Sequence, residues 1–417
     1  MVTVRLATDN FRESLHLLTT RRFGTFWIAS LLSNIGTWAQ QVAEPWLLLT
    51  LGASPLLIGL DSFAMDAPVW LLTLTGGALA DRADRRRVIS IFQTIQMLCP
   101  MAIVVLLLTH RIHPWTIVAL SVVVGLTDAL SMPSFQSIVP SIVAREDVGR
   151  GLALNSTQFS LSRIFGPAIA GALISTVGIT ACFVVNAASY VPFIGVALWI
   201  LPRWTPDRVF PQRSGSNPIG IALRDALRQA DVRGALMSVF VSALLCMPLL
   251  TFAPVLVQAV FRGNALHFSA ALAAFGVGGL IGGMGLLGVP RSVDPRRLTS
   301  AFAQALAVLV IAAAVNRWWW ALPPLLLLAG ISMTISNISA NTVVQGTVAP
   351  HTLGRTVSLY MLAIRGGGAL GAVITGAAVT SFGVQRALLI NGSLAVAIQA
   401  ILGRNVGRSR ARIDVSV

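Results

Sequence analysis

The sequence predicts an all-α membrane protein whose twelve transmembrane helices form two pseudo-symmetric six-helix bundles. Three observations support this fold class: the composition, the number and length of the apolar runs, and an internal repeat. Of the 417 residues, 55% are hydrophobic and 11% are charged, and the mean hydropathy is +0.78. Soluble globular domains average roughly 45–50% apolar and about 25% charged residues, so this chain is predicted to lie in a membrane.

Twelve apolar runs can be assigned as membrane spans. A helix needs roughly 20 apolar residues to cross the hydrocarbon core, and short polar turns separate the runs. The predicted spans are 23–50, 55–80, 88–109, 115–140, 150–176, 179–201, 234–261, 266–289, 298–315, 318–347, 355–380 and 383–403.

The arginines predict the orientation of these spans. The formal net charge is +15, and every basic residue is arginine. If the polar turn at 81–87 is cytoplasmic, nearly all loop arginines share its side, and only Arg111, Arg262, Arg317 and Arg386 lie on the other. Basic loops mark the cytoplasmic side of a bilayer, so both termini are predicted to be cytoplasmic, in the cell inner membrane. The same distribution explains the basicity without a nucleic-acid partner.

The chain repeats itself at a shift of about 205 residues, as in the pairs Gly166 and Gly371, Gly178 and Gly383, and Asn186 and Asn391. A segment rich in proline, serine and glycine separates the copies. The predicted organisation is a cytoplasmic N-terminal tail at 1–22, a six-helix bundle at 23–201, a cytoplasmic linker at 202–232, a second six-helix bundle at 233–403 and a cytoplasmic C-terminal tail at 404–417.

The turn after the second span carries the most informative motif, Gly77-Ala-Leu-Ala-Asp81-Arg82-Ala-Asp84-Arg85-Arg86-Arg87. It resembles the loop signature of the major facilitator superfamily, G-x-L-a-D-R-x-G-R-R. The matching positions are Gly77, Leu79, Asp81, Arg82, Arg85 and Arg86, and Asp84 replaces the usual glycine. The resemblance implies the major facilitator fold, in which Asp81 would face the N-terminal end of the eleventh span near His351 to Arg355 and act as a cytoplasmic latch.

A second resemblance is narrower. Its residues are Gly36-Thr-Trp38-Ala-Gln40-Gln41-Val-Ala43-Glu44-Pro45-Trp46 and Gly52-Ala-Ser54-Pro55 in the first two spans, and Ala153-Leu154-Asn155-Ser156, Phe159, Arg163 and Phe183-Val-Val-Asn186-Ala in the fourth to sixth. Together they resemble enterobactin exporters and related drug-efflux proteins of the same superfamily. Gly166-Pro167-x-x-Ala170-Gly171 also resembles the G-P-x-x-G-G signature associated with antiporters. Small residues let helix backbones approach closely, and Pro167 bends the span. Gly166, Pro167 and Gly171 are therefore predicted to form a helix-packing signature, with tight packing alone as the simpler interpretation.

The first span carries a polar strip between two tryptophans. An apolar cavity with aromatic walls and a few polar groups suits an amphipathic organic ligand. Polar packing between helices is the alternative. The candidate substrate residues are Trp38, Gln40, Gln41, Glu44, Trp46 and, in the eleventh span, Arg365.

Ionisable residues inside spans are costly, so Glu44, Asp66, Asp128, Arg163 and Arg365 are functional candidates. Asp128 and Arg163 are predicted to lie at about the same depth, roughly 18–20 Å from the cytoplasmic end, which predicts an ion pair with either a structural or a gating role. Arg365 lacks an acid at its depth in its own half, and in the family arrangement Asp66 on the second span is a possible partner. Proton coupling is expected to rest on a carboxylate exposed to the central cavity, with Glu44 as the first candidate and Asp66 as the second.

The sequence therefore predicts a secondary active transporter rather than an enzyme. It would export a small organic molecule of the drug or siderophore class by alternating access, in exchange for protons, and work as a monomer. An importer of the same fold and a non-transporting scaffold or sensor are the alternatives. Cys99, Cys182 and Cys246 lie in different spans without metal-ligand spacing, so we expect buried thiols, no metal site and no cofactor.

Overall fold

A computed structural model describes residues 16–82, 84–136, 138–200, 228–290, 292–348 and 353–413. Within these ranges the chain is built from helices and turns, and no strand occurs. Ten of the described helical segments are long and apolar enough to cross a membrane. Two further long helices, α2 (Arg21–Thr50) and α3 (Pro55–Arg82), complete a set consistent with the predicted twelve. The all-α membrane fold is confirmed.

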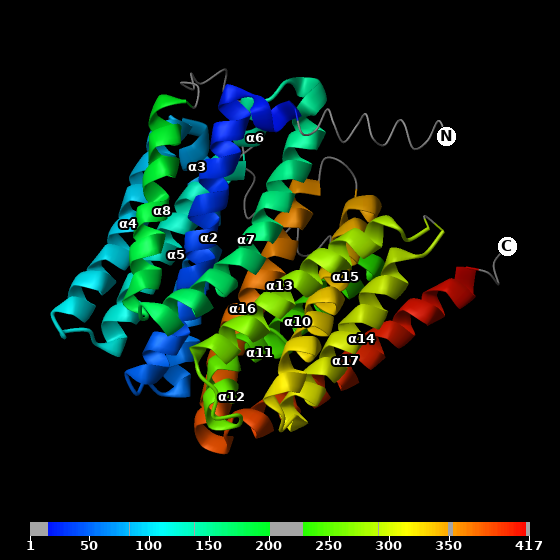
Figure 1. Ribbon diagram of the computed structural model, residues 1–417. Helices are drawn as coiled ribbons and strands as arrows, with labels where there is room; N and C mark the ends of the chain where they lie inside the picture. Colours follow the sequence, from blue (N-terminus) through cyan, green and yellow to red (C-terminus); the bar gives the residue numbers. More distant parts are fainter. Residues whose placement is uncertain are drawn as a thin grey trace, which may run out of the picture. The chain divides into compact units, whose positions relative to one another are not determined.

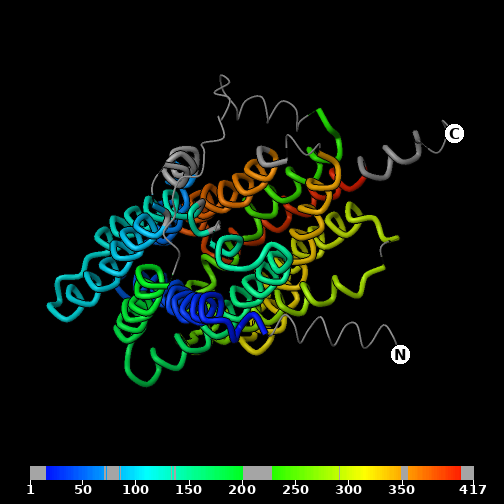
Figure 2. The backbone as a smooth tube through the Cα atoms, turned by 90° about the horizontal axis from the view of Figure 1, so that it is seen from above, coloured from blue at the N-terminus to red at the C-terminus, as the bar shows by residue number. Residues whose placement is uncertain are grey.

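The described contacts divide the chain into two compact units: residues 1–44 with 68–211, and residues 45–67 with 212–417. The first unit contains the start of α2, the end of α3 and the helices that follow them (Figure 1). These are α4 (Arg85–Leu108), α5 (Pro114–Gln136), α6 (Ile138–Ile142), α7 (Val148–Thr176) and α8 (Thr180–Trp199). α4 packs against α8 and forms an antiparallel hairpin with α5, which both Figure 1 and Figure 2 show.

The second unit contains the segment 45–67 and all later helices. These are α10 (Ala230–Leu245), α11 (Pro248–Thr251), α12 (Ala253–Ala259), α13 (Ala265–Leu287), α14 (Pro295–Val315), α15 (Leu322–Thr347), α16 (Leu353–Phe382) and α17 (Val384–Ile413). α13 and α14 pack on α15, α14 packs on α17, and α10 packs on α16. The α14–α17 contact repeats the α4–α8 contact of the first unit, because these helices occupy equivalent places in the repeat.

One predicted span is not a single helix. The run 234–261 is divided into α10, α11 and α12. Pro248 and Pro254 explain this division, because proline lacks the backbone N–H and clashes with the preceding helical turn. Hydropathy predicts one span here because the apolar composition continues through both prolines.

The predicted boundaries shift at three places. α10 begins at Ala230, so the last residues of the predicted linker are helical, and α17 continues to Ile413 through most of the predicted C-terminal tail. Arg21 and Arg22, which the sequence places in the N-terminal tail, begin α2. The segment 45–67 belongs to the first bundle in the predicted organisation, but its contacts are with the second unit.

The repeat is visible in the backbone at two glycines. Gly178, after α7, has φ +104°, and Gly383, after α16, has φ +82°. Both amides donate to a carbonyl in the last turn of the preceding helix, Leu173 and Val379 respectively. Only glycine adopts this left-handed conformation at little cost, so a glycine ends the helix at the same point of both copies.

A second repeated feature begins α4 and α14. Asp84 accepts a hydrogen bond from the backbone N–H of Arg86 at 3.1 Å, and Asp294 accepts one from that of Arg296 at 2.9 Å. Each aspartate is thus the N-cap of its helix. In the sequence Asp84 is only a departure from the family signature, and the structure gives it this capping role.

Candidate functional site

Glu44 lies inside the first unit, where it is 4% exposed. Its Oε1 accepts a hydrogen bond from the Ser121 hydroxyl of α5 at 2.7 Å, and its Oε2 accepts one from Gln40 Nε2 at 2.8 Å. Gln40 Oε1 in turn accepts from Asn186 Nδ2 of α8 at 2.6 Å. We call Gln40, Glu44, Ser121 and Asn186 the Glu44 chain. It links three helices through a buried carboxylate whose two oxygens both contact neutral donors.

The second repeat fills the equivalent positions with leucine. At a shift of 205 residues, Gln40, Glu44 and Ser121 correspond to the buried Leu245, Leu249 and Leu326. The structure supports this alignment, because Gly166 lies against Ala39 on α2 while its equivalent Gly371 lies against Leu244 on α10. The fold therefore packs these positions without polar groups in one copy, so the Glu44 chain is a feature of the first unit and not a requirement of the architecture.

Burial of Gln40 and Glu44 favours the alternative interpretation of the polar strip, which is packing between helices. Gln41 is partly buried on α2. Trp46 belongs to the second unit, where its ring stacks on Phe268 of α13 with centroids 6.0 Å apart. The substrate role of these residues remains a prediction.

Asp128 lies at the centre of a second polar cluster in the first unit. Its Oδ1 accepts a hydrogen bond from Gln96 Nε2 of α4 at 2.8 Å, and the same nitrogen lies 3.1 Å from the Thr127 hydroxyl. Gln93 extends the cluster by donating to Gln96 Oε1 at 2.8 Å. The amide of Gln96 therefore supplies the Asp128 carboxylate with a hydrogen bond that water would otherwise provide.

Arg163 contacts an aromatic pair on α2 and α7. Its guanidinium carbon lies 5.3 Å from the centre of the Trp38 ring, within the range of a cation–π contact, and Phe159 packs edge-on against Trp38 at 6.0 Å. The predicted ion pair between Arg163 and Asp128 stays a prediction, since the geometry above describes other partners for each residue.

The helix-packing signature lies directly beside this pair. A side chain at Gly166 would overlap Trp38 Cβ, and it would come within 3.1 Å of both the Ala39 amide nitrogen and the Ile35 carbonyl oxygen. Gly166 and Gly171 are buried, as is Pro167 inside α7. The close approach of α2 and α7 that the motif predicts is present.

Asp66 and Arg365 form an ion pair in the second unit. Arg365 Nη1 on α16 lies 2.6 Å from Asp66 Oδ1 on α3, and the two side chains are 32% and 28% exposed. Nearby, Gly59 lies against the Ala372 backbone, and the Leu56 amide donates to the Thr380 hydroxyl at 3.2 Å. The predicted Asp66–Arg365 pair is confirmed, and it belongs to a close contact between α3 and α16.

Part of the loop signature lies outside the described residues. These are the surroundings of Gly77, the side chains of Asp81, Arg82, Arg85 and Arg355, and the whole of His351, so the latch remains a prediction. Arg86 is described, and its Nη1 donates to the Leu198 carbonyl oxygen at the end of α8 at 2.7 Å.

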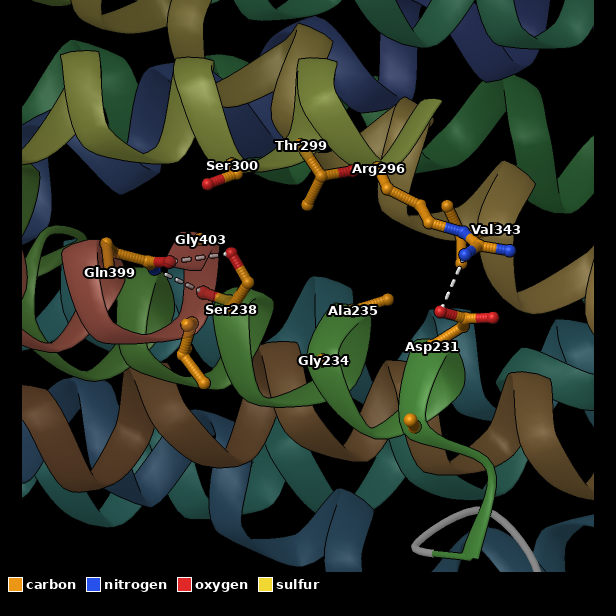
Figure 3. Close-up of a pocket in the computed structure, with 12 residues that line it drawn as sticks. Asp231, Gly234, Ala235, Ser238, Arg296, Thr299, Ser300, Val343, Gln399 and Gly403 are labelled. Carbon is orange, nitrogen blue, oxygen red and sulfur yellow. Dashed lines mark hydrogen bonds and ion pairs between the residues drawn. The ribbon is translucent and has the colours of Figure 1, made fainter. Parts of the chain in front are cut away.

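A small pocket opens between α10, α14, α15 and α17 in the second unit (Figure 3). An ion pair between Arg296 and Asp231 at 2.8 Å bounds one side, and a hydrogen bond from Ser238 to Gln399 at 2.9 Å bounds the other. The cavity volume is about 30 Å³. That space holds water but no organic ligand, so this pocket is not a substrate site.

Sequence reasoning missed most partners of the charged residues. Ser121 gave no signal, because a single serine in an apolar run is common. Gln93 and Gln96 carried a usable signal, since two amides three residues apart lie on one helix face.

The three cysteines are free and buried, as predicted, and no metal-binding cluster of histidine, cysteine or carboxylate side chains occurs among the residues that the structure describes.

Both the sequence and the fold are similar to those of known proteins. A family model described as transmembrane secretion effector matches residues 13–411. The chain is 23% identical to the staphyloferrin A transporter of Staphylococcus aureus over 90% of this chain and 94% of that protein, and 26% identical to the multidrug efflux pump Tap of Mycolicibacterium fortuitum over 87% and 90%. The fold is similar to that of the nucleoside transporter NupG, with a TM-score of 0.70 at 14% identity over 93% of this chain and 99% of that one. The chain therefore belongs to the transmembrane secretion effector family, a group of secondary transporters within the major facilitator superfamily.

Proposed function

We propose that this transporter exports a small organic molecule of the drug or siderophore class and exchanges it for protons. Export is supported by the family and by relatives named for multidrug efflux and for staphyloferrin A transport. In this proposal the arginine-rich loops and both termini face the cytoplasm of an inner membrane, and a single chain carries out transport by alternating access.

The proposed exchange for protons is supported by the buried carboxylate of Glu44. A carboxylate in a membrane span is costly, and leucine fills the equivalent packed position in the second repeat. Retaining an acid there therefore needs a reason other than stability. Gln40 and Ser121, which donate hydrogen bonds to Glu44, are neutral groups that can stay in contact with the carboxyl group in either protonation state, which makes Glu44 a suitable proton carrier.

Asp66 is the second candidate and has a different character. It is ion-paired to Arg365, so protonation of Asp66 would leave a positive charge in a span without its partner. We propose that this ion pair, and with it the α3–α16 contact, forms and breaks as the transporter changes conformation. The transported proton is assigned to Glu44.

Transport by everted membrane vesicles tests the proposal. Vesicles with and without the protein receive a macrolide and staphyloferrin A as separate labelled probes, under an imposed pH gradient that is acid inside. We expect protein-dependent accumulation of at least one probe, lost when a protonophore collapses the gradient. Uptake only by right-side-out vesicles would instead indicate an importer, and no flux of any probe in either orientation would favour a scaffold or sensor.

A further inference from the structure

The hydroxyl of Ser121 lies between two acceptors. Its Oγ is 2.7 Å from Glu44 Oε1 and 3.1 Å from the carbonyl oxygen of Ile117, one turn earlier on α5. A serine hydroxyl has one hydrogen and two acceptor lone pairs, so it can donate to only one of these oxygens at a time. The other contact then requires a different hydrogen or remains a simple close approach.

The two protonation states of Glu44 resolve this competition in opposite ways. When Glu44 is ionised, Ser121 donates its hydrogen to Oε1. When Oε1 carries a proton, the carboxyl group donates to Ser121 Oγ, and the Ser121 hydrogen turns to the Ile117 carbonyl, the usual back-bond of a serine inside a helix. The hydroxyl hydrogens of Ser121 and of the protonated carboxyl group each have an acceptor among these oxygens, and no heavy atom has to move.

The contacts of Gln40 and Asn186 are compatible with both states. Gln40 Nε2 donates to Oε2, which is an acceptor whether or not Oε1 carries the proton, and Asn186 fixes the orientation of the Gln40 amide through its other end. From α4, the titratable side chain that faces Glu44 is Cys99, a buried thiol that donates to the Ile95 carbonyl at 3.4 Å.

We infer that Ser121 is the positioning residue of the proton site: rotation of its hydroxyl lets the buried Glu44 take up and release a proton without losing its hydrogen bond to α5. This inference rests on the proposed proton exchange and adds the group that makes it possible. Leucine at the equivalent position 326 of the second repeat has no hydroxyl, and that repeat has no acid at the position equivalent to Glu44.

Infrared difference spectroscopy of the purified, reconstituted protein tests the inference without a substrate. The C=O stretching band of a protonated carboxyl group is followed as the pH is lowered, and Glu44→Gln identifies the part of the band that belongs to Glu44. In Ser121→Ala both states of Glu44 lose the serine contact, but the hydrogen bond to the ionised carboxylate is the stronger of the two, so we expect the Glu44 band to appear at a pH higher by about one unit. Ser121→Thr keeps the hydroxyl and should restore the wild-type transition.

The outcomes separate the two proposals. If Glu44→Gln removes a titrating band but Ser121→Ala leaves its transition pH unchanged, Ser121 has no positioning role and the proton role of Glu44 stands. If Glu44→Gln removes no titrating band, Glu44 is not the proton site and the proton part of the proposed function falls with it. A structural role for Ser121 would change thermal stability alone, and Ser121→Thr would then differ from Ser121→Ala only in that measurement.

Discussion

Gly371→Ala is expected to disrupt the second unit although it adds a single methyl group. The new Cβ would overlap the Leu244 carbonyl oxygen and come within 2.8 Å of its carbon and 3.0 Å of its Cα, all of them backbone atoms of α10. Backbone cannot rotate away, so α10 and α16 must separate. Overpacking of this kind costs about 1–3 kcal/mol and sometimes more, which we expect as a lower midpoint of thermal unfolding in detergent.

The same helix provides the control. At Gly368, three residues earlier on α16, the methyl group of an alanine would have no heavy atom within 4 Å beyond the backbone of its own helix. Gly368→Ala should therefore be neutral or stabilise by up to about 1 kcal/mol through helix propensity. The first unit offers an equivalent comparison, in which Gly166→Ala meets Trp38 and Gly149→Ala meets open space. Equal midpoints for the members of either pair would contradict the close helix crossings.

Removing one member of the Asp66–Arg365 pair should impair both stability and transport. Asp66→Asn or Arg365→Gln leaves the other charge without its partner, and the loss for a fully buried pair is about 3–5 kcal/mol. We expect less than that here, because the side chains are 28% and 32% exposed. Unfolding midpoints and vesicle transport of both single variants and of the double variant form the measurement.

The double variant decides whether the two charges act on each other. Asp66→Asn with Arg365→Gln restores neutrality, so it should be more stable than either single variant. Asp231→Asn is the control, since Asp231 and Arg296 form a pair of similar length at helix ends, where such contacts contribute about 0–1 kcal/mol. Strictly additive losses at Asp66 and Arg365 would show that their contact contributes nothing.

The charged residues show how far sequence reasoning reaches. The Asp66–Arg365 pair could be predicted because an ionisable residue in a span needs a partner, and in the family arrangement few acids lie at the depth of Arg365. The partners of Glu44 could not be predicted in the same way. Helix periodicity shows that Gln40 and Glu44 share a face of α2, but it does not show whether that face meets a neighbouring helix or open space.

The helix boundaries were predictable where residues with fixed conformations mark them. Gly178 and Gly383 end two helices at equivalent points of the repeat, and Asp294 before Pro295 is a recognisable start. The division of the seventh span could also have been read from Pro248 and Pro254. The shift of the segment 45–67 to the second unit had no sequence signal, because hydrophobic composition does not specify which helices meet inside a membrane.

The most direct test of the proton role is the transport of an accepted probe by Glu44→Gln in everted vesicles. Glutamine preserves size and hydrogen bonding but cannot be ionised. Our account predicts that the variant still exchanges labelled for unlabelled probe across the membrane without a pH gradient, while accumulation driven by the gradient falls to the level of vesicles treated with a protonophore. Gradient-driven accumulation equal to that of the unmodified protein would contradict the account.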